Sequence, residues 1–246
     1  MTKILKLKDL SKRFGAIVAS NKIDFNLKRN EIHALIGPNG AGKSSLVKQI
    51  IGEIRQDSGE IWLNGEEISH LSTSERVCRG LARTFQVTNV VGEFSVLENV
   101  MLAVIGYMRS SFNFFISKKK YEELYQQAFL SLVDTELEHK KDLLANQLSH
   151  GERRQLELCL VLALRPKIIL LDEPMAGLGL DAIDKMKKIF SEVKVKAPIL
   201  LIEHDMNVVF SLADRISVLV YGKIIATGDS LTIKNDEQVQ QAYLGI

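Results

Sequence analysis

The chain alternates between segments of two hydrophobic periodicities, and this alternation predicts a mixed α/β fold. Near the N-terminus, Lys3–Lys8 and Ile23–Leu27 alternate apolar with polar residues, as half-buried strands do. Ile32–Ile36 is apolar almost throughout, which is typical of a strand buried on both faces. Gly59–Gly65 predicts a further strand that ends in an Asn-Gly turn.

The second half of the chain returns to strands and helices after a more polar, helical stretch. Ile168–Leu171 and Ile199–Ile202 predict buried strands. The other predicted elements are helices over Ser45–Gly52, Ala182–Val193, Met206–Ala213 and Ser230–Leu244, and a hairpin of Ile216–Val220 with Lys223–Ala226. We therefore expect one domain over residues 1–246, with an α/β core at 1–87 and 160–246 and a helical subdomain at about 88–159.

Composition and charge exclude several classes of protein. Of 246 residues, 46% are hydrophobic and 25% charged, as in ordinary globular domains. The net charge of +2 gives no support for a nucleic-acid partner. Cys78 and Cys159 are far apart, so neither a disulfide framework nor a zinc site is predicted, and a reducing cytosol fits. No run approaches the ~18 apolar residues that a membrane-spanning helix needs, so the sequence predicts a soluble protein.

A glycine-rich segment at Gly37–Ser45 (GPNGAGKSS) carries the first chemical motif. It fits the pattern G-x-x-x-x-G-K-[ST] and lies between a predicted buried strand and a predicted helix. Glycine lets the backbone wrap closely around phosphates, so that its N–H groups and the helix N-terminus face negative charge. Lys43 is expected to neutralise the β- and γ-phosphates, and the Ser44 hydroxyl to ligate Mg²⁺. The residues predicted to bind the nucleotide here are Gly37, Pro38, Asn39, Gly40, Ala41, Gly42, Lys43, Ser44 and Ser45.

Two carboxylates follow the apolar strand Ile168–Leu171 and form the second motif. Asp172 is expected to hold the Mg²⁺ through water, and Glu173 to act as general base on the attacking water. The alternative is a strand end that carries two solvated carboxylates. The presence of the Gly37–Ser45 loop in the same chain favours the hydrolytic interpretation.

Five segments in this order resemble the motifs of an ATP-binding-cassette (ABC) ATPase, and the resemblance covers the whole chain. They are Gly37–Ser45, Gln86, Leu148–Glu152 (LSHGE), Ile168–Pro174 and His204. The resemblance implies a P-loop NTPase (RecA-like) core with an antiparallel β subdomain and a helical subdomain. It also implies ATP and Mg²⁺ as cofactors, and ATP hydrolysis at an interface between two ATPase subunits.

The same resemblance implies roles for single residues. Ser149 and Gly151 would contact the γ-phosphate held by the partner subunit's glycine-rich loop, and Gln86 would sense Mg²⁺ and join the core to the helical subdomain. His204 would contact the γ-phosphate and position the water, and Phe14 would stack on adenine. Core packing is the alternative for His204 and Phe14, and a plain surface position for Gln86. The implied Mg²⁺ ligands are Ser44, Gln86 and Asp172.

Three positions depart from the family's usual pattern. His150 replaces the first glycine of the common LSGGQ, and Glu152 replaces its glutamine. Gly179 stands where the D-loop normally ends in aspartate, so it cannot make the carboxylate contact that the family uses across the dimer. These departures put the coupling between the two ATP sites in question, whereas the residues for hydrolysis are retained.

Several longer segments resemble the ATPases of bacterial branched-chain amino acid importers and their urea or short-amide relatives. They are RTFQ, PMAGLG, LLIEHDMNVVFSLADRISVLVYGKIIATGD and the closing AYLG. This implies a peripheral subunit on the cytoplasmic face of the bacterial inner membrane. Its partners would be a second ATPase subunit (a second copy or a paralogue), two transmembrane permease subunits and, indirectly, a periplasmic solute-binding protein. The lobe after Val87 would grip the permease, and local packing is the alternative for its apolar patch Phe112–Ile116.

Other functions fit the sequence less well. The ATPase of a lipopolysaccharide exporter is the nearest rival, because it shares the single-cassette architecture. A non-transport ABC ATPase acting on DNA or ribosomes would normally carry a second cassette or a long coiled-coil insertion, and this chain has neither. A small-molecule P-loop kinase would lack the LSHGE segment.

Overall fold

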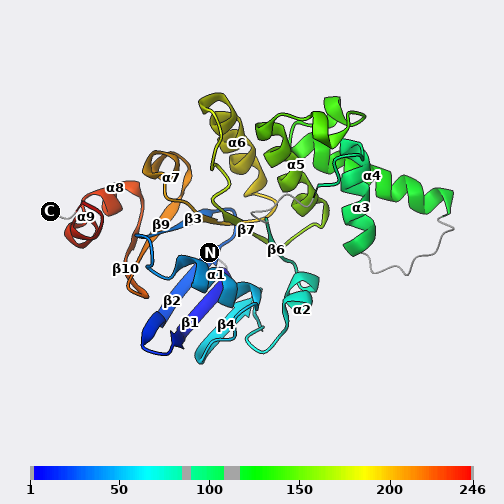
Figure 1. Cartoon of the computed structure of the whole chain (residues 1–246). Coiled ribbons are helices and arrows are strands. Elements are labelled where there is room, and N and C mark those ends of the chain that lie inside the picture. The colour runs from blue at the N-terminus through cyan, green and yellow to red at the C-terminus, as the bar shows by residue number, and fades with distance from the viewer. Residues whose placement is uncertain (1–2, 85–89, 108–116, 245–246) are drawn as a thin grey trace. The chain divides into compact units, whose positions relative to one another are not determined.

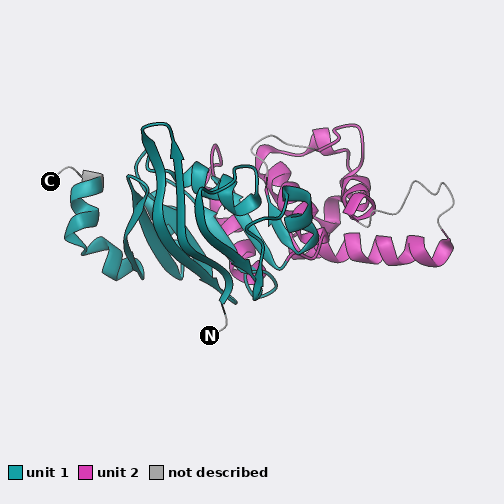
Figure 2. Ribbon diagram, turned by 90° about the horizontal axis from the view of Figure 1, so that it is seen from below, with its two compact units in different colours: residues 1–83, 167–173, 194–246 teal, residues 84–166, 174–193 magenta. Residues whose placement is uncertain are grey.

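The computed structural model describes residues 3–84, 90–107 and 117–244, and the chain divides into two compact units (Figure 2). Unit 1 comprises Met1–Arg83, Lys167–Glu173 and Lys194–Ile246, and unit 2 comprises Thr84–Pro166 and Pro174–Val193. Residues 174–193, which we expected within the core, are therefore grouped with the helical part of the chain.

Unit 1 is built on a six-stranded, mainly parallel sheet with the order β10-β9-β3-β8-β7-β6 (Figure 1). These strands are β3 (Ile32–Ile36), β6 (Leu81–Arg83), β7 (Ile168–Asp172), β8 (Ile199–Ile202), β9 (Arg215–Val220) and β10 (Lys223–Gly228). Only the β9–β10 pair is antiparallel within this sheet. The buried strands predicted over 32–36 and 199–202 are confirmed. The carboxyl ends of the parallel strands meet at one edge, where ligands bind in open α/β sheets.

A second, four-stranded antiparallel sheet with the order β2-β1-β4-β5 also belongs to unit 1. It contains β1 (Lys3–Phe14), β2 (Ile17–Lys28), β4 (Ser58–Leu63) and β5 (Glu66–Glu67). The alternating segments correctly predicted strands here, but β1 and β2 are both longer than expected. They continue toward a tight turn after Phe14, where pairing between the two strands replaces burial as the stabilising interaction.

The helices of unit 1 are α1 (Lys43–Ile51), α2 (Thr73–Cys78), α7 (Met206–Leu212), α8 (Ser230–Lys234) and α9 (Glu237–Leu244). The apolar face of α1 packs in one buried cluster with side chains from both sheets. The single C-terminal helix predicted over 230–244 is wrong: it is two helices. Asn235 ends α8, and the Asp236 carboxylate accepts a hydrogen bond from Val239 N at 3.0 Å, which starts α9.

Unit 2 is helical, as the sequence predicted for this stretch. It contains α3 (Val96–Tyr107), α4 (Lys118–Asp134), the short 3₁₀ helices η1 (Glu138–Lys140) and η2 (Ala145–Gln147), α5 (His150–Ala163) and α6 (Leu180–Val193). The apolar faces of α3, α4 and α5 share one core, which includes Val100, Leu124 and Leu156. Among the described residues, no helix is long and apolar enough to cross a membrane. A parallel core sheet, an antiparallel sheet and a helical part are the expected fold class.

Candidate nucleotide site

The segment Gly37–Gly42 joins β3 to α1 as a turn that exposes backbone. Gly40 has a φ of 80°, and an added Cβ there would meet nothing within 4 Å. Gly42 has a φ of 110°, and an added Cβ would lie 2.3 Å from the carbonyl oxygen of Ala19. Both residues adopt the left-handed region that favours glycine. The turn therefore offers main-chain groups, rather than side chains, to a ligand on its open side.

The N-terminus of α1 has no side-chain cap among the described residues. Its N-cap is Gly42, which supplies no side-chain acceptor. Other helices begin differently, since α2, α4, α5, α7 and α8 are capped by Ser72, Ser117, Ser149, Asp205 and Asp229. The first N–H groups of a helix lack partners within the helix, and the helix dipole favours an anion there. The start of α1 therefore fits a phosphate group.

Lys43 begins α1, and its side chain folds back over the turn. Its Nζ donates hydrogen bonds to the carbonyl oxygens of Gly37 at 2.6 Å and Pro38 at 3.1 Å. Burial lowers the pKa of the Lys43 ammonium, and the nearby carboxylates of Glu173 and Asp172 act in the opposite direction. The positive charge thus lies beside the turn and within electrostatic range of both carboxylates.

The other predicted residues of the loop differ in exposure. Asn39 and Ser44 are exposed, so the Ser44 hydroxyl on the first turn of α1 is accessible. Ala41 is buried, and its carbonyl accepts a hydrogen bond from Gly222 N at 2.9 Å, which ties the loop to the β9–β10 hairpin. Ser45 is partly buried, and its carbonyl accepts from Gln49 Nε2 at 3.1 Å.

Asp172 ends β7, and an arginine that sequence reasoning missed holds its carboxylate. Arg83 Nη2 donates to Asp172 Oδ2 at 2.8 Å, and the two side chains are 14% and 6% exposed. Arg83 Nη1 also lies 3.5 Å from a carboxylate oxygen of Glu53. No spacing rule links Arg83 to Asp172, because they are 89 residues apart and meet only through the parallel pairing of β6 with β7.

Glu173 and His204 follow the neighbouring strands β7 and β8 and meet at the same sheet edge. His204 Nδ1 lies 3.5 Å from Glu173 Oε1 and 3.8 Å from Glu203 Oε2. The His204 side chain is 63% exposed, which excludes the core-packing alternative. Glu203, which the sequence did not single out, is buried and accepts a hydrogen bond from His204 N at 3.1 Å. A carboxylate and an imidazole are thus paired at the surface of this edge.

Phe14 lies at the end of β1 with 44% of its surface exposed, so it is not a core residue. Lys12 Nζ lies 5.4 Å from the centroid of its ring, within the range of a cation–π contact. An exposed aromatic ring of this kind is available for stacking. Gln86 and the patch Phe112–Ile116 lie outside the described residues.

The LSHGE segment forms the start of α5 in unit 2. Ser149 is the N-cap: its Oγ accepts from Glu152 N at 3.4 Å, and its own N–H donates to Glu152 Oε2 at 2.9 Å, a reciprocal capping box. Gly151 is helical, and an added Cβ would lie 3.0 Å from Ala182 Cβ. His150 Nε2 lies 3.4 Å from where a Cβ on Gly177 would be. The histidine that replaces the usual glycine is therefore close to the loop before α6.

A divalent cation has no protein-only site within the described part of the chain, since no group of three His, Cys, Asp or Glu residues could hold one there. The accessible Ser44 hydroxyl and the Asp172 carboxylate are each a single oxygen donor group, which suits a hard cation such as Mg²⁺. Mg²⁺ commonly binds through one or two protein groups plus substrate phosphates and water. This donor set therefore fits a cation that arrives with a nucleotide.

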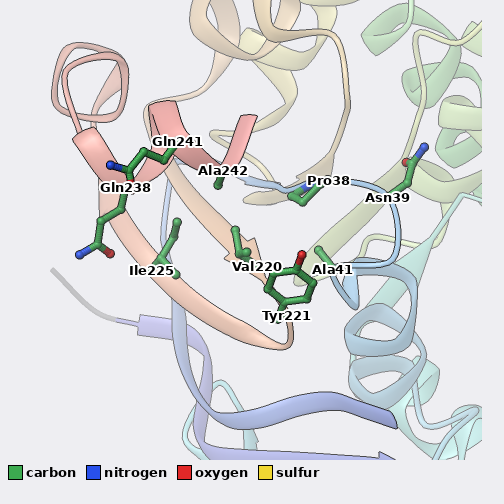
Figure 3. Close-up of a pocket in the computed structure, with 9 residues that line it drawn as sticks. All are labelled: Pro38, Asn39, Ala41, Val220, Tyr221, Ile225, Gln238, Gln241 and Ala242. Carbon is green, nitrogen blue, oxygen red and sulfur yellow. The ribbon is translucent and has the colours of Figure 1, made fainter. Parts of the chain in front are cut away.

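A pocket of about 490 Å³ lies on one side of the glycine-rich turn (Figure 3). Pro38, Asn39 and Ala41 line it from the turn, and Val220, Tyr221 and Ile225 from the β9–β10 hairpin. The remaining wall comes from α9 through Gln238, Gln241 and Ala242. These residues are uncharged, so the pocket offers nothing to neutralise a triphosphate. The side of the turn that carries Lys43 is the better phosphate site.

Comparison with known proteins gives the same answer as the geometry. The family model described as "ABC transporter" matches residues 20–176. The chain is 34% identical to the lipopolysaccharide export system ATP-binding protein LptB of Haemophilus influenzae, over 98% of this chain and 97% of that protein. It is 32% identical to the probable branched-chain amino acid transport ATP-binding protein LivG of Archaeoglobus fulgidus, over 99% of this chain and 96% of that protein.

Solved structures agree on the fold. The ADP conformation of an ATP-binding cassette of an ABC transporter superposes with a TM-score of 0.87 at 29% identity, and covers 100% of both chains. A dimeric cassette in a post-hydrolysis state, bound to ADP and Pi, superposes with a TM-score of 0.74 at 27% identity, over 92% of this chain and 98% of that one. The expected fold class is therefore confirmed, and the chain belongs to the ATP-binding proteins of ABC transporters, the ATPases that hydrolyse ATP to power transport.

Proposed function

We propose that this chain is the ATPase subunit of an ABC importer that takes up branched-chain amino acids or related small polar solutes such as urea and short amides. The observation that carries the catalytic part is the Glu173–His204 pair beside the Lys43 loop. Identity alone does not select the solute, because the LivG and LptB relatives are 32% and 34% identical to this chain. The RTFQ, PMAGLG and LIEHD segments favour the importer branch.

ATP would bind with its β- and γ-phosphates against the uncapped start of α1. The Lys43 ammonium would leave the carbonyls of Gly37 and Pro38 and donate to phosphate oxygens instead, and Phe14 would stack on the adenine. Ser44, Gln86 and Asp172 would hold Mg²⁺, which would neutralise charge on the phosphates. Arg83 would keep the Asp172 carboxylate in a single orientation through the bond to Oδ2.

Glu173 would orient the attacking water and accept its proton, because its carboxylate follows β7 directly beside Asp172. His204, 3.5 Å from Glu173, would hold that carboxylate in place and contact the γ-phosphate. General-base catalysis of this kind contributes about 10²–10⁴-fold to a rate, so the pair can account for a large part of turnover.

Cassettes of this family dimerise and pair with transmembrane subunits. In this chain, Ser149 and Gly151 of one subunit would face the γ-phosphate bound by Lys43 of the other. The two subunits, identical or paralogous, would dock on two permeases at the cytoplasmic face of the inner membrane and receive solute from a periplasmic binding protein. Closure of the ATPase interface would drive the permease, and hydrolysis would reset it.

The hydrolytic assignment is tested by Glu173→Gln in the purified protein. We expect kcat for ATP hydrolysis to fall by at least about a hundredfold because the general base is lost. ATP binding should persist, and an ATP-bound dimer should accumulate. Glu66→Gln, an exposed carboxylate on β5, is the matched control and should leave kcat unchanged. Turnover that survives Glu173→Gln would show that another group is the base.

The solute assignment is tested in cells by uptake of labelled leucine, urea and acetamide with and without this subunit. We expect uptake of one of them to disappear without the subunit and to return with the intact chain, but not with Glu173→Gln. Unchanged uptake of all three, together with loss of lipopolysaccharide from the cell surface, would replace the importer by the exporter.

A further inference from the structure

The start of α5 carries a negative charge at the place where the proposed function requires a phosphate to bind. Glu152 occupies the third helical position, and its Oε2 accepts from Ser149 N at 2.9 Å. A carboxylate there satisfies the helix N-terminus and competes with any other anion for the same positive end of the helix dipole. The glutamine of the usual LSGGQ could cap the helix without adding a charge. This chain therefore needs something to offset the charge of Glu152.

Lys140 supplies that charge from η1. Its Nζ donates a hydrogen bond to Glu152 Oε1, and the two side chains are only 29% and 22% exposed. Each Glu152 oxygen thus has a partner: Oε1 accepts from the lysine and Oε2 from Ser149 N. The Lys140 hydrogen bond lowers the pKa of Glu152 to about 2, so the Glu152 carboxylate is ionised at neutral pH.

The Ser149 side chain interacts with Glu152 in two ways. Its oxygen accepts from Glu152 N, and, after the hydrogen bond from Lys140, a hydrogen bond from the Ser149 side chain also lowers the pKa of the Glu152 carboxylate. When a nucleotide arrives, the hydroxyl hydrogen would turn from Glu152 to a phosphate oxygen while the oxygen continues to cap the helix. The Glu152 carboxylate accepts hydrogen bonds from Lys140 Nζ and from Ser149 N, and these two bonds hold it against the helix N-terminus.

We propose that Lys140 is a positioning residue for ATP-dependent closure: it neutralises Glu152 and so allows the capped start of α5 to receive the γ-phosphate bound by the partner subunit. This inference rests on the proposed function of Ser149 at the dimer interface. It adds a residue outside the LSHGE segment, and it explains how this chain carries an acidic residue in that segment without repelling the nucleotide.

The test uses the full chain with hydrolysis blocked by Glu173→Gln, and measures dimer formation by light scattering while Mg-ATP is titrated. In this background, Lys140→Met should raise the ATP concentration for half-maximal dimerisation about fivefold, as expected for loss of one partly buried ion pair. Lys141→Met is the matched control. Lys141 is the next residue and pairs with exposed Asp142 instead, so its substitution should change the midpoint less than about twofold.

The decisive arm is the double variant Lys140→Met/Glu152→Gln. Glu152→Gln keeps the cap but removes the charge, so it should lower the ATP midpoint, and adding Lys140→Met to it should have almost no further effect. Thermal unfolding without nucleotide reports damage to the fold separately. A merely structural lysine would lower the melting temperature in both backgrounds and would not be rescued by Glu152→Gln.

The outcomes separate two failures. Equal midpoints for Lys140→Met and Lys141→Met, or a Lys140→Met defect that Glu152→Gln does not relieve, would overturn the role of Lys140 while ATP-dependent dimerisation itself stands. Absence of an ATP-dependent dimer in the Glu173→Gln parent would overturn the proposed interface, and the inference with it.

Discussion

Two helix N-termini in this protein, both proposed to face phosphate, are built in opposite ways. The start of α1 is a glycine turn with no side-chain cap among the described residues, and Lys43 lies over it. The start of α5 is fully capped by Ser149 and Glu152, and Lys140 neutralises the cap. Both ends carry one lysine. At α1 the lysine donates to carbonyl oxygens of the turn, whereas at α5 it donates to a carboxylate side chain.

The difference follows from what each end must do without nucleotide. The α1 terminus is held by its surroundings, because its loop bonds to the β9–β10 hairpin and α1 is buried between strands of both sheets. It can therefore leave its first N–H groups for phosphate. The α5 terminus lies at an exposed position, and its cap maintains the helix while the partner is absent. The uncapped N-terminus of α1 therefore requires support from tertiary structure, whereas the solvent-exposed N-terminus of α5 requires its own side-chain cap.

The largest expected effect is a loss of ATP affinity from a substitution at the uncapped N-terminus of α1. Gly42→Ala would place a Cβ 2.3 Å from the Ala19 carbonyl at a φ of 110°, so the turn must distort. We expect ATP affinity to fall by about a hundredfold or more, since phosphate binding depends on that backbone. Gly151→Ala at the capped end meets only Ala182 Cβ at 3.0 Å in helical backbone and should fold normally. Nucleotide titration and thermal melts of both variants give the comparison, and equal ATP affinities would contradict it.

The next largest effect is on the free energy of unfolding and concerns the C-terminus of α1. Arg76 is buried, and its Nη1 donates to the carbonyls of Gln49 and Ile50, both at 2.7 Å, which caps the C-terminus of the helix. Arg76→Met keeps much of the volume but removes the buried guanidinium donor from both carbonyls, and Gln49 O retains only the hydrogen bond from Gly52 N at 3.2 Å, so we expect a loss of about 3 kcal/mol in unfolding free energy. Urea denaturation measures it. Arg79→Met, at the C-cap of the helix α2 that contains Arg76, removes a more exposed ion pair with Glu66 and should cost less than about 1 kcal/mol.

A smaller effect is expected from removing the cap of α5. Ser149→Ala should lower the free energy of unfolding by about 1 kcal/mol, the usual value for an N-cap serine. If the hydroxyl also binds phosphate, ATPase activity should fall far more than this modest loss of stability explains. Ser117→Ala, the N-cap of α4, is the matched control, with a similar stability loss and unchanged ATPase. Proportionate losses in both variants would show that Ser149 is only a cap.

The smallest effect is a change in acid stability. Because the Lys140 hydrogen bond lowers the pKa of Glu152 from 4.5 to about 2, folded Glu152 binds a proton less readily than unfolded Glu152. The stabilisation of the folded state by ionised Glu152 is therefore fully present above about pH 4.5 and is lost as the pH falls toward 2. Glu152→Gln should remove this pH-dependent stabilisation. The melting temperature of the variant should therefore fall less steeply than that of the parent between these pH values. Parallel pH profiles would show that the ion pair does not stabilise the fold.

Local patterns predicted the elements where burial and period agree. Ile32–Ile36 and Ile199–Ile202 are mainly apolar runs, and their strands have the predicted bounds. The hydrophobic pattern failed to predict a helix boundary where two polar residues end one helix and begin the next. Asn235 and Asp236 separate α8 from α9 by capping, although the apolar spacing continues across them. The three-residue strand β6 was missed because its hydrogen bonds to β7, rather than its own composition, define it.

The sequence by itself predicted the chemistry of the nucleotide site, because the order of its motifs and the glycines, Lys43, Asp172 and Glu173 are local features of the chain. The tertiary structure alone decided which groups support them. Arg83 reaches Asp172 from the neighbouring strand, and Lys140 reaches Glu152 from a separate short helix. Such partners carry no spacing rule, since the chain between them folds away before they meet. The LSHGE segment therefore predicted a phosphate contact, and only the fold showed that Lys140 is paired with its glutamate.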